Sequence, residues 1–230
     1  MTKPDHALLS LLHLCDSLFP IGSFAYSDGL ESAAAAGLVT GPADLAGWVE
    51  ISLDEGFGRL DGPGIVSVWP AVEAADWDAV AALDEELTAL RPSSTARLAN
   101  RSMGLRLLKT WQGLHPDVRL DRMLGLVAVR RLGPALPVAF AAAGCCGGIA
   151  RRDLLAGYAY ARLAATISAA MRLIAIGQTD AHQLLNSALA RVPSAIDAVL
   201  ARQAPPESFT PALDVAQMNQ QYLHARLFRS

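Results

Sequence analysis

One long apolar segment, residues 154–176, does most to constrain the fold of this chain. Its residues are apolar nearly all round a helical projection, as expected for a helix that other helices surround. Arg162 and Arg172 lie near or within its interior, and an arginine is costly in the hydrocarbon of a membrane. The segment therefore predicts a central core helix, with both arginines partly exposed and paired.

Helical patterns recur along the rest of the chain, whereas the alternation typical of strands is nearly absent. We therefore expect an all-α, single-domain helical bundle of about ten helices over residues 1–230, with a C-terminal docking tail over about residues 211–230. Start and stop signals predict helices that begin near residue 5, at Leu30, after Gly41-Pro42, at Asp61-Gly62-Pro63, after Asp76, at Ser93 or Ser94, and after Gly177-Gln178, where Thr179 is the expected cap.

Composition favours some classes of protein over others. An apolar fraction of 52% and a mean hydropathy of +0.29 predict apolar surface that other chains cover, so an oligomer or a complex is expected. A net charge of -3 argues against a dedicated nucleic-acid binder. Pro4, Asp5 and His6 interrupt the beginning of the sequence where a secretory signal would be apolar, and three cysteines do not form a disulfide framework. We expect a cytoplasmic protein.

A compact loop, residues 16–31, interrupts the helical pattern near the beginning of the sequence and reads DSLFPIGSFAYSDGLE. Phe19-Pro20 pushes the chain out of the α region, and Gly22 permits a conformation closed to other residues. Phe24 and Tyr26 add large rings, although helix connections are usually short and polar. The loop is therefore either packed against the body or offered to a partner, and the sequence leaves both readings open.

The sequence ends in an unusual way, with residues 225–230 reading ARLFRS. Chain ends are normally polar and frayed, whereas here arginines flank Leu227 and Phe228. This pattern predicts an end that docks into the body or into a partner.

Catalytic and metal-binding motifs are mostly missing. The sequence contains no GxxxxGK[ST] loop, no HExxH and no Glu-x-x-His pair. His13, Cys15 and Asp16 form the best metal-like cluster, but residues two apart on a helix diverge. Cys145-Cys146 lies among alanines and glycines, where cysteine behaves as a small buried hydrophobe. We assign no catalytic residue and no metal ligand.

Two other classes of protein remain as alternatives at this point. The first is a helical enzyme or metal-binding protein that uses His13, Cys15, Asp16 or the Cys145-Cys146 pair. The second is a helix-turn-helix regulator built around residues 184–200, which the acidic balance disfavours.

Five blocks, in order and spacing, resemble the urease accessory protein UreF family over nearly the whole chain. They are residues 16–31, RSMGLRLL at 101–108, LPVAF at 136–140, ISAAMRLIAIGQTDAHQLL at 167–185, and the terminal RLFRS. The resemblance implies a non-enzymatic assembly factor that forms a homodimer and binds UreD (also called UreH) and the GTPase UreG. Their complex inserts nickel into apo-urease, so this chain would need no cofactor, because the partner binds GTP. It would bind neither nucleic acid nor membrane.

In that family the loop and the C-terminal tail recruit partners. The resemblance therefore implies a partner-binding role for Gly22, Phe24, Tyr26, Ser27, Glu31, Arg226 and Arg229. The tail departs from the family pattern at residues 217–221, which read QMNQQ where Ser-Met-Arg-His-Glu is common, so contacts that need those charges are in question. The family modulates the GTPase either as an activator or as a gate on its timing. Arg101, Arg226 and Arg229 are available to an activator that supplies an arginine to the phosphates.

Overall fold

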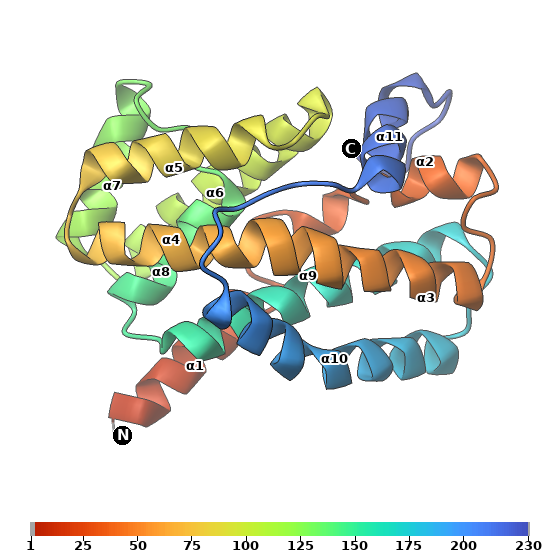
Figure 1. The fold of residues 1–230 in the computed structure, drawn as a ribbon, viewed down its shortest axis with the longest axis horizontal. Helices are drawn as coiled ribbons and strands as arrows, with labels where there is room; N and C mark the ends of the chain where they lie inside the picture. The colour runs from red at the N-terminus through yellow and green to blue at the C-terminus, as the bar shows by residue number, and fades with distance from the viewer. Residues whose placement is uncertain (1–2, 230) are drawn as a thin grey trace.

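Helices form nearly all of the ordered framework in the computed structural model, which describes residues 3–229 (Figure 1). The α-helices are α1 (Lys3–Cys15), α2 (Leu30–Ala35), α3 (Pro42–Ile51), α4 (Gly62–Glu73), α5 (Trp77–Ala89), α6 (Ser94–Leu114), α7 (Val118–Ala128), α8 (Leu136–Cys146), α9 (Arg151–Leu173), α10 (Gln178–Ala201) and α11 (Pro211–Asn219). Shorter elements are the 3-10 helices η1 (Ser23–Ala25) and η3 (Gln220–Tyr222), and the π-helix η2 (Ser52–Asp61). No strand occurs within residues 3–229, which confirms the expected all-α fold.

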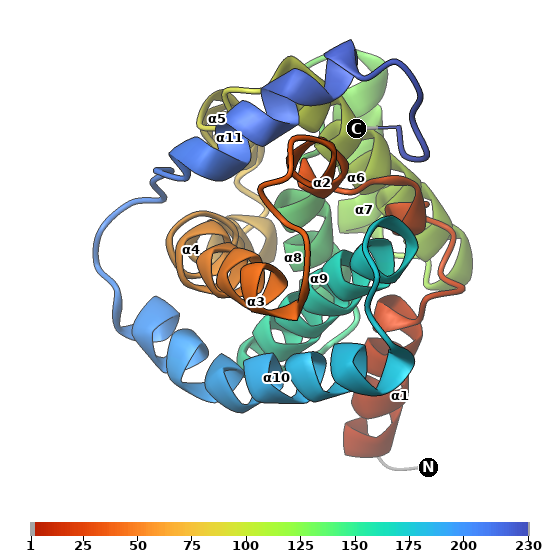
Figure 2. The ribbon, with the colours of Figure 1, turned by 90° about the vertical axis from the view of Figure 1, so that its right-hand side faces the viewer.

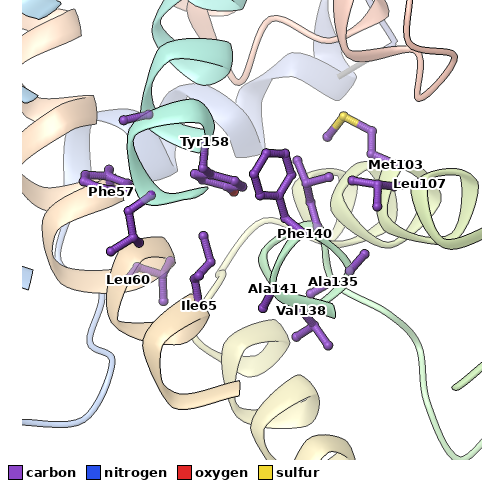
Figure 3. Close-up of a cluster of buried hydrophobic side chains, with 14 of the residues drawn as sticks. Phe57, Leu60, Ile65, Met103, Leu107, Ala135, Val138, Phe140, Ala141 and Tyr158 are labelled. Carbon is purple, nitrogen blue, oxygen red and sulfur yellow. The ribbon is translucent and has the colours of Figure 1, made fainter. Parts of the chain in front are cut away.

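Helix α9 is the central element, as the long apolar segment predicts. It contacts α1, α2, α3, α4, α8 and α10. Tyr158 from α9 lies between Phe140 of α8 and Phe57 of η2, with ring centroids 5.1 and 6.4 Å away (Figure 3). The helix ends at Leu173, slightly before the end of the apolar segment.

Helix α4 begins at Gly62 with Pro63 in its first turn, as Asp61-Gly62-Pro63 predicts, although α3, η2 and α4 follow one another without a break. In η2 the backbone bonds reach one residue further back than in an α-helix, as in the bond from Gly62 N–H to the Phe57 carbonyl. Pro63 cannot donate a backbone hydrogen bond, but it lies in the first turn of α4, where the π register ends and a missing donor costs least.

Capping residues explain where several other helices begin. Asp76 accepts the Ala79 N–H and Ser93 accepts the Ala96 N–H, which confirms both predicted caps. Thr179 is not a cap, because α10 already begins at Gln178 after Gly177. The sequence prediction omitted α7, although Asp117 accepts the Arg119 N–H at its N-cap.

Helix α10 is continuous over residues 178–201, so a helix-turn-helix around residues 184–200 is wrong. Within residues 3–229 it is the one helix whose length and composition would suffice to cross a membrane. Here it packs along α9, and Arg191 on its exposed side donates to Glu50 Oε1 at 2.5 Å and to Asp54 Oδ2 at 2.8 Å. This arrangement is typical of a helix on the outside of a bundle.

A buried carboxylate fixes the start of α8, which crosses α6 closely. Asp84 of α5 is 1% exposed and accepts the Gly133 N–H at 3.0 Å and the Ala135 N–H at 2.7 Å, each through a different oxygen. Gly104 of α6 allows the approach, since a Cβ there would lie 2.1 Å from the Pro134 carbonyl oxygen. Burial raises the Asp84 pKa to about 6, although both backbone N–H groups oppose the shift.

This shift predicts how Asp84 contributes to stability at different pH values. Because the folded-state pKa lies above the unfolded value, the folded chain binds more protons between about pH 4 and pH 6, and the Asp84 contribution falls as the pH rises. Asp84→Ala should therefore cost more stability near pH 4 than near pH 7, by about 2 kcal/mol. Chemical denaturation over this pH range measures the difference. Asp78→Ala, at an exposed carboxylate of the same helix, is the control. Parallel pH curves for Asp84→Ala and the wild type would contradict the prediction.

Candidate functional site

The loop of residues 16–31 packs some of its aromatic rings and exposes another. Phe19 is 3% exposed, with its ring centroid 6.0 Å from that of Trp111, and Tyr26 is 8% exposed. Phe24, in η1, is 66% exposed. The two readings of the sequence therefore apply to different residues of one loop.

Gly22 has a structural reason to be glycine. Its φ is 76°, in the left-handed region, and a Cβ at this position would lie 2.5 Å from Arg106 Nη1. The same Arg106 atom donates to the Ile21 carbonyl at 3.1 Å, while its other terminal nitrogen donates to Ser102 Oγ at 3.0 Å. Gly22 thus lets an arginine of α6 hold the turn that precedes Phe24.

Glu31 joins the loop to the C-terminal part of the chain. Its side chain is buried, and its Oε1 accepts the Leu227 N–H at 2.5 Å. Its Oε2 accepts the Phe228 N–H at 3.2 Å and Gln220 Nε2 at 2.5 Å. At the start of α2, the Glu31 N–H in turn donates to Ser27 Oγ at 3.4 Å. A single carboxylate therefore satisfies N–H groups from a segment nearly 200 residues away in sequence.

The tail also contacts the loop and α9 directly. Phe228 is 3% exposed, and the Arg172 guanidinium carbon lies 4.5 Å from its ring centroid, as in a cation–π contact. Arg172 Nη1 also donates to the Phe24 carbonyl at 3.3 Å. The Arg229 N–H donates to the Ala25 carbonyl at 2.8 Å. Figure 2 shows α11 lying over α2, with the end of the chain beside it.

These contacts bring the predicted loop and tail residues together. Gly22, Tyr26, Ser27 and Glu31 shape the loop, whereas Phe24, Arg226 and Arg229 are exposed beside the half-exposed Leu227. We call Phe24, Arg226, Leu227 and Arg229 the loop–tail surface. Ser230 lies outside the described residues.

Sequence reasoning missed three residues of this arrangement. Arg172 and Arg106 come from helices far away in sequence, and no local pattern indicates their contacts with the loop. Gln220 belongs to the run that departs from the family pattern, yet it is fully buried. Besides its bond to Glu31, its Oε1 accepts the Ser32 N–H at 3.2 Å, so a neutral amide serves this position well.

The metal-like clusters of the sequence do not converge. Among residues 3–229, no group of three or more His, Cys, Asp or Glu side chains is placed to hold a metal ion. His13 lies edge-on to Phe19, with ring centroids 5.4 Å apart, whereas Cys15 faces α9 at Gly157. Burial raises the pKa of the Cys15 thiol to about 12, which disfavours the thiolate that a metal would need.

The Cys145-Cys146 pair, at the end of α8, is half-buried. Cys145 Sγ lies 3.6 Å from Arg119 Nη1. Burial raises the pKa of the Cys146 thiol to about 12, although the Arg119 charge opposes this. The two thiols are therefore half-buried and mostly protonated at neutral pH. This agrees with cysteines that pack as small apolar residues, although they are less buried than the sequence predicts.

An apolar groove lies between α1, α9 and the start of α10, next to the loop. Its volume is about 810 Å³. The α9 wall consists largely of small residues, including Ala161, Ala164 and Ala165. The other side chains that line it include the exposed groups Leu12, Phe24, Tyr160 and Met171.

Comparison with known proteins places this arrangement in a family. The sequence model of the UreF family matches residues 39–189. The chain is 31% identical over 224 residues to the urease accessory protein UreF of Methylibium petroleiphilum, covering 97% of this chain and 94% of that protein. It is 33% identical over 227 residues to the protein of the same name from Granulibacter bethesdensis, covering 98% and 95%. The chain therefore belongs to the UreF family of urease accessory proteins.

Proposed function

We propose that this chain is a urease maturation factor that acts as a non-enzymatic scaffold. With UreD/UreH and the GTPase UreG it would promote the GTP-dependent insertion of nickel into apo-urease, in the cytoplasm. Family membership over nearly the whole chain is the observation that carries this proposal. The chain itself would hold no cofactor, because nickel is the cargo of the complex and the GTPase binds GTP.

The loop–tail surface is the part of the chain that we propose to recruit the partners. It combines two exposed apolar groups, Phe24 and Leu227, with the cations Arg226 and Arg229. Aromatic and arginine side chains are enriched at protein–protein interfaces, which favours Phe24 and the two arginines as the main contacts. The bonds of Glu31 hold the tail backbone in place, so less conformational entropy would be lost when a partner binds.

Two roles toward the GTPase are open to this chain, an activator and a gate on the timing of hydrolysis. An activator acting in trans would supply an arginine to the phosphates, and Arg101, Arg226 and Arg229 are all exposed. Single-turnover GTP hydrolysis, measured with each arginine replaced by alanine, separates the roles. Loss of stimulation with unchanged binding supports the activator, whereas earlier hydrolysis in the absence of urease supports the gate.

The proposed function predicts that this chain is required for urease activation. UreD, UreG and apo-urease from the same source, supplied with nickel and GTP, should give active urease only when this chain is present. Urease activity and bound nickel are both measured, with heat-inactivated chain as the control. Equal activation without this chain would contradict the proposal.

The loop–tail surface predicts two substitutions that weaken recruitment of UreG. Phe24→Ala and Arg229→Ala should each reduce the affinity by about tenfold, because hot-spot side chains typically contribute at least 1 kcal/mol. Calorimetric titration of the UreD-bound chain with UreG measures this, and circular dichroism checks the helical fold.

Val129→Ala removes an exposed apolar side chain at the C-cap of α7 and is the matched control. Helix α7 lies on the opposite side of the molecule from α11 (Figure 1). Wild-type affinity in both loop–tail variants would contradict the role of this surface.

We propose that the apolar groove binds a second copy of this chain. Leu8 lies one helical turn from Leu12, so the exposed side of α1 continues the groove wall. In a two-fold arrangement each copy would therefore offer an exposed leucine ridge to the groove of the other. We propose this arrangement for the homodimer, in which the second copy would cover Leu12 and Tyr160 and leave Phe24, on the loop side of the groove, to the GTPase.

A charge in the groove should break such a dimer. Ala165→Glu should yield a monomer, because a carboxylate facing an apolar surface would lose its water on association. Light scattering after size-exclusion chromatography measures the mass, with Ala128→Glu on the exposed end of α7 as the control. A dimer of wild-type strength in Ala165→Glu would exclude this groove as the interface.

A further inference from the structure

A cluster of charged and polar side chains lies between α9 and α11, around one cavity. Arg162 forms an ion pair with Asp28 of the loop. Arg91, after α5, forms an ion pair with Asp61, the last residue of η2. Tyr158 Oη donates to the second Asp61 oxygen at 2.7 Å. We call these five residues, of which Asp61 and Tyr158 are buried and the others half-buried, the α9 charge network.

Opposite charges alternate along this network. Burial by itself would lower the pKa of Arg162, but the charge of Asp28, and further away that of Asp61, outweighs it and raises the pKa. Arg91 responds in the same way to Asp61. Both arginines are therefore firmly charged, and removing either carboxylate would leave a half-buried cation without its partner.

The backbone at Asp28 explains what the first ion pair holds. Asp28 has φ of 51° and Gly29 has φ of 88°, so two consecutive residues occupy the left-handed region just before α2. A non-glycine residue is uncommon there, although aspartate and asparagine tolerate it better than most. The Arg162 side chain, fixed on the central helix, binds the carboxylate of this turn and favours its unusual conformation.

The turn at Asp28-Gly29 also supports the tail. A Cβ on Gly29 would lie 2.8 Å from the Gln217 backbone nitrogen, so α11 rests directly on the turn. The next turn of chain brings Gln220 to Glu31, whose carboxylate holds Leu227 and Phe228. These contacts link the turn at Asp28-Gly29 to the tail.

We infer that Arg162 is a positioning residue for the loop–tail surface. Through its ion pair with Asp28 it sets the turn at Asp28-Gly29, and this turn places α11 and the tail. The role of that surface in partner recruitment rests on the proposed function. The positioning itself does not, so it can be tested on the chain alone.

Hydrogen exchange of the full chain, resolved by residue, distinguishes positioning from general stabilisation. Asp28→Asn keeps a residue that tolerates the left-handed region but removes the negative charge. The amides of Leu227, Phe228 and Arg229 should then exchange about tenfold faster, because their acceptors are no longer held in place. The amides of residues 139–142 in α8 should keep their wild-type rates.

Two further variants complete the test. Asp197→Asn breaks the exposed Arg152–Asp197 ion pair and should leave all these amides unchanged. The double variant Asp28→Asn/Arg162→Gln removes both charges of the ion pair, so neither is left unpaired. It is measured if Asp28→Asn does not fold. The tail amides should again exchange faster while the α8 amides keep their wild-type rates. The inference is overturned if the tail amides keep their wild-type rates, or if tail and α8 amides accelerate by the same factor.

Binding of UreG by Asp28→Asn separates this inference from the proposed function. A loosened tail together with weakened binding supports both. A loosened tail with wild-type binding supports the positioning role of Arg162 and contradicts the recruiting role of the loop–tail surface. An unchanged tail overturns the positioning role whatever the binding shows.

Discussion

Irregular backbone can pack against a helical body only when its N–H groups find hydrogen-bond acceptors. In this chain the carboxylates of two buried residues are such acceptors. Asp84 binds the irregular segment before α8, and Glu31 binds the tail. In both cases the carboxylate extends from a regular helix and accepts from separate backbone groups with its two oxygens. The helices thus provide rigid positions from which the irregular segments are held.

Sequence patterns were most informative where the physics is local. Helical periodicity indicated the all-α fold, and the caps at Asp76 and Ser93 are short-range hydrogen bonds that one stretch of sequence contains entirely. The sequence located the loop of residues 16–31 but did not indicate which of its residues pack and which are exposed. No local pattern distinguishes the packed Phe19 from the exposed Phe24. That distinction depends on Trp111, which lies on another helix.

Other features escaped prediction because tertiary contacts outweigh local signals. Gly62-Pro63 correctly indicated the start of α4, but no local pattern indicated that the π-helix η2 joins it to α3 without a break. Glu31 was selected through a family resemblance, and nothing near it in sequence indicates that Leu227 and Phe228 are its partners. The π-helix has a cost in backbone geometry, but it ends at Asp61, which it delivers to Arg91 and Tyr158.

The long sequence separation between Glu31 and its partners also has a consequence for biosynthesis. Leu227 and Phe228 leave the ribosome 196 and 197 residues after Glu31. Until then the carboxylate has no tail to hold, and the loop can fold only onto the helices already made. The contacts of Glu31 with the tail can therefore form only after nearly 200 further residues have been made, so this surface is among the last parts of the fold to be completed.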